Sequence, residues 1–165
     1  MSVTTRPAVP ADAALILDFI HGLAAYEKLL HEVQTTEDDV RTLLFCPSPR
    51  AFCDIAEVSD EPVGFALWFY SVSTFAGRHG IYLEDLYVRP QSRGMGAGKA
   101  LLAGLANRCL TEDLARLEWQ VLDWNAPAIA FYDSLEAAAM TDWTTRRLSG
   151  EALSALAKAD RKSVV

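Results

Sequence analysis

The sequence predicts an α/β fold in which helices flank a mixed, mostly antiparallel sheet. A short strand and two amphipathic helical segments come first, a meander of apolar strands follows, and the chain then alternates strand, helix, strand, helix and strand. Strands in a meander pair antiparallel, whereas strands joined through a helix pair in parallel. The combination therefore favours one mixed sheet over an all-helical or all-β fold.

The first half of the chain supplies two helices and the meander. Pro10 and Asp12 open one helix, and Thr36 with Asp39 forms a capping box that starts the second. The apolar residues expected to face the core from these helices are Ile16, Phe19, Ile20, Leu23, Val40, Leu43 and Leu44. Strands are expected at residues 3–6, 51–58, 63–72 and 81–88, with a hairpin turn at 59–62 and a loop at 75–80.

The second half alternates strands and helices. A helix at residues 96–111 is expected to bury an apolar face made of Leu101, Leu102, Leu105, Ala106 and Cys109. Asn125 can cap a further helix that has Pro127 in its first turn and continues to Leu135. The remaining elements are expected to be strands at 116–122 and 140–148 and a terminal helix at 150–157.

Composition and charge restrict the function classes. The chain has 165 residues, which suits a single domain spanning residues 1–165. No apolar run approaches the roughly 20 residues that cross a bilayer, and the first residues lack the apolar core of a signal peptide, so we expect a cytoplasmic protein without a membrane partner. A net charge of −7 disfavours nucleic acid as a partner and weakly suits a cationic substrate.

The cysteines and histidines do not suggest a metal site. Cys46, Cys53 and Cys109 are widely spaced among apolar neighbours, which is typical of small buried hydrophobic residues. The histidines lack the spacing of metal ligands. No metal is therefore expected.

A glycine-rich turn joins the strand expected at 81–88 to the helix that follows. It reads Gln-Ser-Arg-Gly-Met-Gly-Ala-Gly-Lys over residues 91–99. Glycines let the backbone approach a ligand, and a helix N-terminus offers free amides with partial positive charge, so a pyrophosphate is a suitable ligand. A structural turn without a ligand is the alternative.

The two common nucleotide-binding patterns do not fit this turn. A Walker loop would need glycine at Arg93 and Ser or Thr at Ala100. The third glycine of the dinucleotide pattern would fall on Lys99 or on Leu101. Another kind of pyrophosphate ligand is therefore indicated.

The pattern Arg93-x-x-Gly96-x-Gly98 resembles the R/Q-x-x-G-x-G/A signature of the GNAT superfamily of N-acetyltransferases. The segments at 82–88 (YLEDLYV), 121–125 (VLDWN) and 130–132 (AFY) also match, and together they resemble the diamine (spermidine/spermine, thialysine) acetyltransferase branch. The resemblance implies a GNAT fold whose sheet is splayed at a cofactor cleft, with acetyl-CoA as co-substrate. It also implies a homodimer, which is usual in that branch.

The same resemblance implies where the cofactor would bind. The loop amides would hold the pyrophosphate, and the amides of the preceding strand would hold the pantetheine arm. The residues implied in cofactor binding are Leu86, Tyr87, Val88, Arg93, Gly94, Met95, Gly96, Ala97, Gly98, Lys99, Asn125 and Tyr132.

Acidic residues near this segment are candidates for binding an amine. Glu84 and Asp85 are neighbours in an apolar strand, so they should point to opposite faces, and a cleft is a better place for a carboxylate than the core. A solvated face or pairing with arginine is the alternative. By resemblance, Glu84 accepts a proton from the substrate amine, and the acids expected to line the substrate site are Glu27, Glu84, Asp85 and Asp142. Glu27 can also be read as a solvated helix charge.

Tyr132 is the candidate general acid. By resemblance its hydroxyl protonates the departing coenzyme A thiolate, and the alternative is a core aromatic residue. One departure lies close by, because Glu136 stands where the related pattern has glycine. A glycine at a helix end often takes a left-handed conformation, which glutamate adopts at a cost.

The resemblance thus implies direct transfer of an acetyl group from acetyl-CoA to a primary amine, with no acyl-enzyme. The acceptor is expected to be a small polyamine or diamine or a lysine-like amine. Two alternatives stay open: an enzyme of this kind acting on an amino acid, an aminoglycoside-like amine or a protein amine, and a non-catalytic acyl-CoA-binding domain.

Overall fold

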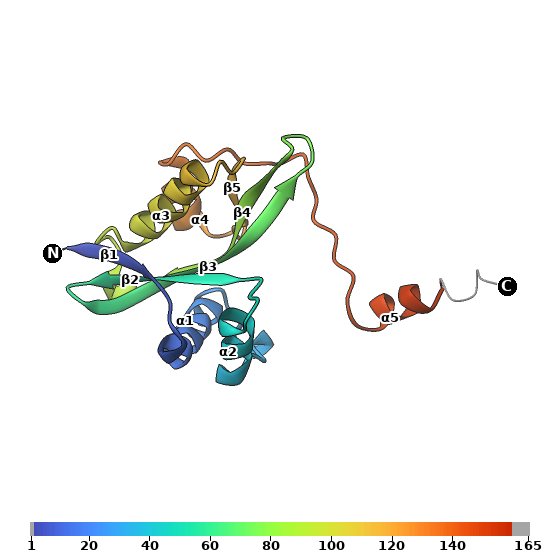
Figure 1. The fold of residues 1–165 in the computed structure, drawn as a ribbon, viewed down its shortest axis with the longest axis horizontal. Helices are drawn as coiled ribbons and strands as arrows, with labels where there is room; N and C mark the ends of the chain where they lie inside the picture. The colour runs from blue at the N-terminus through green and yellow to red at the C-terminus, as the bar shows by residue number, and fades with distance from the viewer. Residues whose placement is uncertain (1, 160–165) are drawn as a thin grey trace. The chain divides into compact units, whose positions relative to one another are not determined.

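The computed structural model describes residues 2–159 (Figure 1). The chain divides into two compact units, Met1–Gln120 and Val121–Val165. The elements of the first unit are β1 (Val3–Pro7), α1 (Ala13–Tyr26), α2 (Glu37–Phe45), β2 (Phe52–Val58), β3 (Glu61–Ser73), β4 (Arg78–Val88), α3 (Ala97–Thr111) and β5 (Leu117–Trp119). The second unit contains α4 (Ala126–Asp133) and α5 (Gly150–Ala159).

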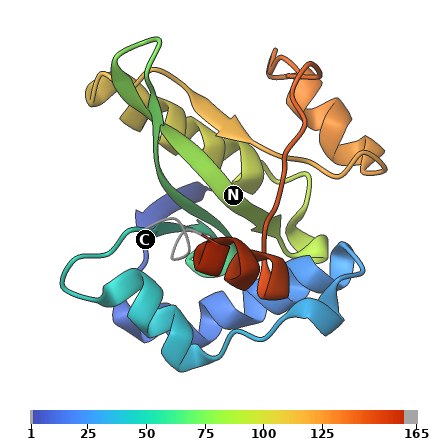
Figure 2. The ribbon, with the colours of Figure 1, turned by 90° about the vertical axis from the view of Figure 1, so that its right-hand side faces the viewer.

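One sheet organises the first unit, and its strands lie in the order β1-β2-β3-β4-β5. The first four strands pair antiparallel, and β5 joins β4 in parallel. Helices α1 and α2 cover one face of the sheet and α3 covers the other (Figure 2). The predicted α/β class with a mixed, mostly antiparallel sheet is therefore confirmed.

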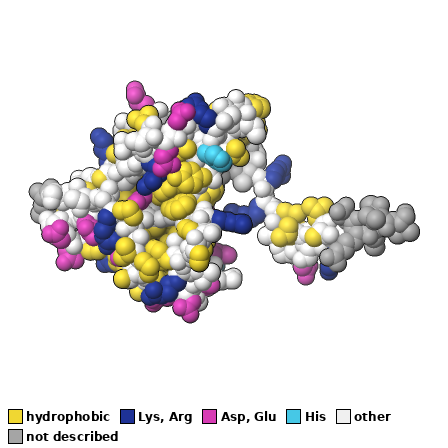
Figure 3. Space-filling view, viewed as in Figure 1, with side chains coloured by type: hydrophobic (Ala, Val, Ile, Leu, Met, Phe, Trp, Pro, Cys, Tyr) yellow, Lys and Arg dark blue, Asp and Glu magenta, His cyan; other side chains and the backbone are white. Residues whose placement is uncertain are grey.

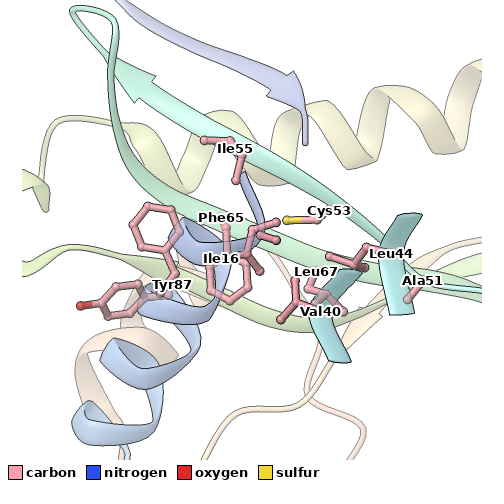
Figure 4. Packing of buried hydrophobic residues seen from close by; sticks show 11 residues of the cluster. Ile16, Val40, Leu44, Ala51, Cys53, Ile55, Phe65, Leu67 and Tyr87 are labelled. Atoms are coloured by element: carbon pink, nitrogen blue, oxygen red, sulfur yellow. The ribbon is translucent and has the colours of Figure 1, made fainter. Parts of the chain in front are cut away.

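The core between the sheet and helices α1 and α2 is built from the predicted apolar faces (Figure 4). Phe19 stacks on Phe65 with ring centroids 5.6 Å apart, and Ile16 and Val40 are almost fully buried. Each side chain of this size contributes roughly 1.5–3 kcal/mol when it is buried. The predicted capping box also forms, because Thr36 Oγ1 accepts the Asp39 N–H at 3.2 Å.

Some predicted boundaries and faces were wrong. Leu43 is 49% exposed and Ala106 is exposed, because both lie on the outer sides of their helices. Strand β4 begins at Arg78, since pairing with the end of β3 extends the hairpin into the expected loop at 75–80. Strand β5 is shorter than the expected 116–122.

In the second unit, α4 begins where it was predicted. Asn125 is buried and its Oδ1 accepts the Ala128 N–H at 3.4 Å, with Pro127 in the first turn. Residues 138–149 contain no helix or strand, so the expected strand at 140–148 was wrong. An isolated segment with strand-like composition forms a strand only where another strand satisfies its backbone groups, and residues 121–159, the described part of the unit, contain none. Helix α5 carries hydrophobic side chains along one side (Figure 3).

Candidate active site

A bulge interrupts β4 at the acidic pair. Leu67 of β3 lies opposite Asp85, and the next residue, Trp68, lies opposite Leu83, so Glu84 is the extra residue. A bulge bends its strand and redirects the side chains beyond it. The register shift thus falls at the residue that was predicted to act as the base.

The bulge also exchanges the faces on which side chains lie. Leu83 shares the face of Trp68, over whose ring the α3 residue Arg108 lies at 5.0 Å. Asp85 shares the face of Leu67, which belongs to the core under α1 and α2. Residues two apart would share a face in a regular strand. Here the bulge moves Asp85 to the α1 side of the sheet.

Beyond the bulge, β4 is no longer paired with β5. The parallel ladder covers only Ile81–Leu117, Tyr82–Glu118 and Leu83–Trp119. Arg89 donates its N–H to Val63 O at 2.8 Å, and alternate residues of a strand point the same way, so Leu86 and Val88 direct their backbone groups away from β3. The expected splaying is confirmed, and it leaves these amides on the open side of β4.

The charges of Glu27 and Glu84 both act on the Asp85 carboxylate, which lies on the α1 side of β4. Burial, followed by the charges of Glu84 and Glu27, raises the pKa of Asp85 to about 6. Burial also raises the pKa of Glu27, which is half-buried rather than a freely solvated helix charge. Glu84 itself is exposed. Together the three carboxylates form a negatively charged region that would favour a cationic ligand.

The glycine-rich turn leads directly into α3. Gly94 and Gly96 have φ of 78° and 92°, which is the left-handed region, and a Cβ on either would meet nothing within 4 Å. Their conformation rather than crowding by the protein therefore requires glycine there. The first N–H groups of a helix have no partner within it, so the α3 N-terminus can bind an anion.

Arg93 connects this turn to its surroundings. Its Nε donates to Val88 O at 3.1 Å, and its guanidinium lies 4.5 Å from the centre of the Tyr26 ring. Tyr26 is the last residue of α1. No role was predicted for Tyr26 from the sequence, although it lies seven residues after Phe19 and thus continues the apolar face of α1.

The other residues predicted to bind the cofactor differ in which of their atoms a ligand can reach. The Tyr87 side chain packs in the core, 6.1 Å from Phe19 between ring centroids, and Ala97 is buried, so only their backbone atoms are available to a ligand. Met95 and Lys99 are exposed and available through side chain and backbone. A pyrophosphate site at this turn would therefore be formed mainly by amides.

Three predicted site residues belong to the second unit. Tyr132 lies on α4, half-buried beside Phe131. Asn125 is the helix cap, and Asp142 is exposed in the segment without regular structure. Glu136 has φ 59° and takes the left-handed conformation itself. The helix thus ends as it would with glycine.

Comparison with known proteins identifies the family of this chain. The sequence profile of the Acetyltransferase (GNAT) family matches residues 20–136, which include the β4 bulge, the glycine turn and Tyr132. The chain belongs to the GNAT family. It is an N-acetyltransferase, and acetyltransferases of this family use acetyl-CoA as co-substrate.

Curated relatives cover nearly the whole chain of this GNAT protein. It is 37% identical to the thialysine N-epsilon-acetyltransferase of Caenorhabditis elegans, with 90% of this chain and 92% of the relative covered. It is 28% identical to the L-ornithine N5-acetyltransferase of Arabidopsis thaliana, with 93% and 87% covered. These relatives match the diamine acetyltransferase branch that the motifs indicated.

Solved structures agree on the fold. An integron cassette protein from the mobile metagenome of V. cholerae has a TM-score of 0.78 and 26% identity, with 96% of this chain and 99% of that one covered.

Within residues 2–159, no group of acidic, histidine and cysteine side chains is arranged to hold a metal ion. Nor is any helix of that part of the chain long and apolar enough to cross a membrane.

Proposed function

We propose that this GNAT protein transfers the acetyl group of acetyl-CoA to a primary amine of a small diamine, polyamine or lysine-like molecule. The acceptor class is supported by relatives named for thialysine and L-ornithine, each of which carries a side-chain amine. The observation that carries the proposal is the acidic region of Glu27, Glu84 and Asp85 beside the bulge. Such a region attracts the ammonium form of an amine.

Residues of the first unit are suited to hold the co-substrate. The amides at residues 94–99 and the Arg93 guanidinium would bind the pyrophosphate, since anions are favoured at a helix N-terminus. The amides of Leu86 and Val88 would bind the pantetheine arm along the open side of β4. Acetyl-CoA supplies a thioester, which a neutral amine can attack directly, so no acyl-enzyme is needed.

Proton transfer to and from the reacting groups would involve two residues. An alkyl amine is protonated at neutral pH, and only its neutral form is nucleophilic, so Glu84 would accept the proton directly or through water. Asp85 and Glu27 would hold the ammonium group of the incoming or distal amine, and Asp142 would contribute a further acid. Tyr132 would protonate the leaving thiolate, and Asn125 would contact the cofactor arm.

We further propose a single-domain, cytoplasmic homodimer without nucleic-acid or membrane partners.

An acceptor panel tests the proposal. Thiol release from acetyl-CoA is measured with thialysine, L-ornithine, spermidine, an aminoglycoside and a lysine peptide, and the acetylated product is confirmed by mass spectrometry. Turnover should be highest for one of the first three. Turnover only with the peptide or the aminoglycoside would favour the alternative acceptors, and cofactor binding without any turnover would favour a non-catalytic domain.

A further inference from the structure

Arg93 connects the glycine turn, to which it belongs, with two further elements of the first unit. It is the residue before Gly94 in the glycine turn, its Nε donates to Val88 O on β4, and its guanidinium lies over the ring of Tyr26. Tyr26 ends α1, and Glu27 follows it directly. One cation therefore joins the proposed pyrophosphate site to the segment that carries an acid of the proposed amine site.

The end of α1 is a strained element. Lys28 has φ 63°, which is unfavourable for any residue with a Cβ. The helix is closed by hydrogen bonds from Lys28 N to Ala25 O at 3.2 Å and from Leu29 N to Ala24 O at 2.8 Å. Such an end opens more readily than a glycine-capped one unless other contacts hold it. The stack of Tyr26 on Arg93 is a contact of that kind.

We propose that Tyr26 is a positioning residue that couples occupancy of the glycine turn to the order of the α1 end, and so to the placement of Glu27. A pyrophosphate on the turn fixes the Arg93 cation beside it, and a fixed cation holds the Tyr26 ring more firmly. Glu27, whose charge acts on Asp85, is then held in place before the amine arrives. Because the bound co-substrate has already ordered the α1 end, the amine binds without that entropic cost. The two substrates therefore bind with positive coupling. The inference rests on the proposed function.

Hydrogen exchange on the full-length protein tests this coupling without any turnover. Exchange of the amides in residues 24–29 is measured with and without coenzyme A, for wild type, Tyr26→Leu and Tyr26→Phe. Coenzyme A should slow this exchange about 5- to 10-fold in wild type and in Tyr26→Phe, which keeps the ring, in line with the usual range of coupling and cation–π free energies. Tyr26→Leu should lose most of the effect. In steady-state kinetics, Tyr26→Leu should raise the amine KM more than it changes kcat.

A second variant, Lys28→Gly, tests the coupling by stabilising the α1 end directly. Lys28→Gly removes the conformational cost at residue 28, because glycine adopts a positive φ freely, so the α1 end should exchange slowly even without coenzyme A, and the ligand should add little further protection. Full protection in Tyr26→Leu, or a wild type that binds coenzyme A without protection at 24–29, would overturn the coupling. A wild type that does not bind coenzyme A in calorimetry would instead overturn the proposed function.

Discussion

Leu67 on β3 lies directly opposite Asp85 on β4, and this pairing leaves Glu84 as the unpaired residue of the bulge. The pairing places an ionisable side chain on the face that α1 and α2 cover. Burial there, with Glu84 and Glu27 nearby, accounts for the raised pKa of Asp85. Stability and chemistry of the site should therefore both depend on pH near neutrality.

Asp85→Asn should make the protein more stable than wild type at pH 8, and roughly half as much more stable at pH 5. The folded-state pKa of about 6 lies above the ordinary value of 3.8, so the folded protein binds the proton more tightly than the unfolded chain. Stability from this group is complete below the unfolded pKa and is lost as pH rises through about 6. The free energy of unfolding that wild type loses through this group, from low pH to pH 8, is at most about 3 kcal/mol. Urea unfolding at both pH values measures it, and a gain that is equal at both values would contradict the raised pKa.

Glu84→Gln should lower kcat/KM by roughly 10²–10⁴-fold at neutral pH, the usual range for loss of a general base. The loss should shrink as pH rises, because more of the amine is then already neutral. Glu61→Gln, an exposed acid at the start of β3, is the matched control and should behave as wild type. A flat pH dependence of the loss would argue for a role of Glu84 in binding alone.

Gly98→Asp should separate helix stability from cofactor binding. Gly98 lies in the first turn of α3, its φ is not in the left-handed region, and a Cβ there meets only Val88 Cγ2 at 3.8 Å. An acid in the first turn favours a helix, so thermal stability should not fall. The added charge should repel a pyrophosphate and weaken coenzyme A binding at least ~10-fold, given Coulomb repulsion at contact distance.

Gly98→Ala is the control and should bind coenzyme A nearly as wild type. Gly96→Val is a poorer probe, since φ of 92° makes valine strained whether or not a ligand binds. Calorimetric titration with coenzyme A checks both Gly98 variants. Unchanged affinity in a folded Gly98→Asp protein would place the pyrophosphate elsewhere.

Tyr132→Phe should lower kcat roughly 10²–10³-fold while leaving acetyl-CoA affinity nearly unchanged. The substitution keeps the ring beside Phe131 and removes only the hydroxyl, which acts mainly as charge develops on sulfur. Rapid-quench kinetics would establish that chemistry limits the rate. Wild-type kcat under those conditions would reduce Tyr132 to a packing residue.

Glu136→Gly should stabilise the protein by about 0.5–1 kcal/mol, the cost of a left-handed residue less the extra chain entropy of glycine. Glu136 N donates to Asp133 O at 3.0 Å and Ala137 N donates to Tyr132 O at 3.2 Å, which is the pattern usually closed by glycine. Glu136→Ala retains the conformational cost and should change stability little. Equal stabilisation by alanine would assign the effect to loss of charge.

The local features of this protein could be predicted from its sequence alone. Each of these features depends on residues that lie close together in the chain, and each was predicted. They are the helix N-termini at Thr36 and Asn125, the hairpin turn between β2 and β3, and the glycine turn before α3. The family signature at Arg93, Gly96 and Gly98 is equally local. Hydrogen bonds between near neighbours and backbone preferences are sufficient to produce such features.

Which residues meet across the sheet depends on the tertiary structure. The position of the bulge is set by the register between β3 and β4, and that register decides that Asp85 lies under α1 while Leu83 faces α3. The stack of Arg93 on Tyr26 joins residues far apart in the chain, and so does the influence of Glu27 on Asp85. Strand pairing and burial are nonlocal, because each residue's partner is fixed by the packing of all the others, so no pattern within a short segment determines them.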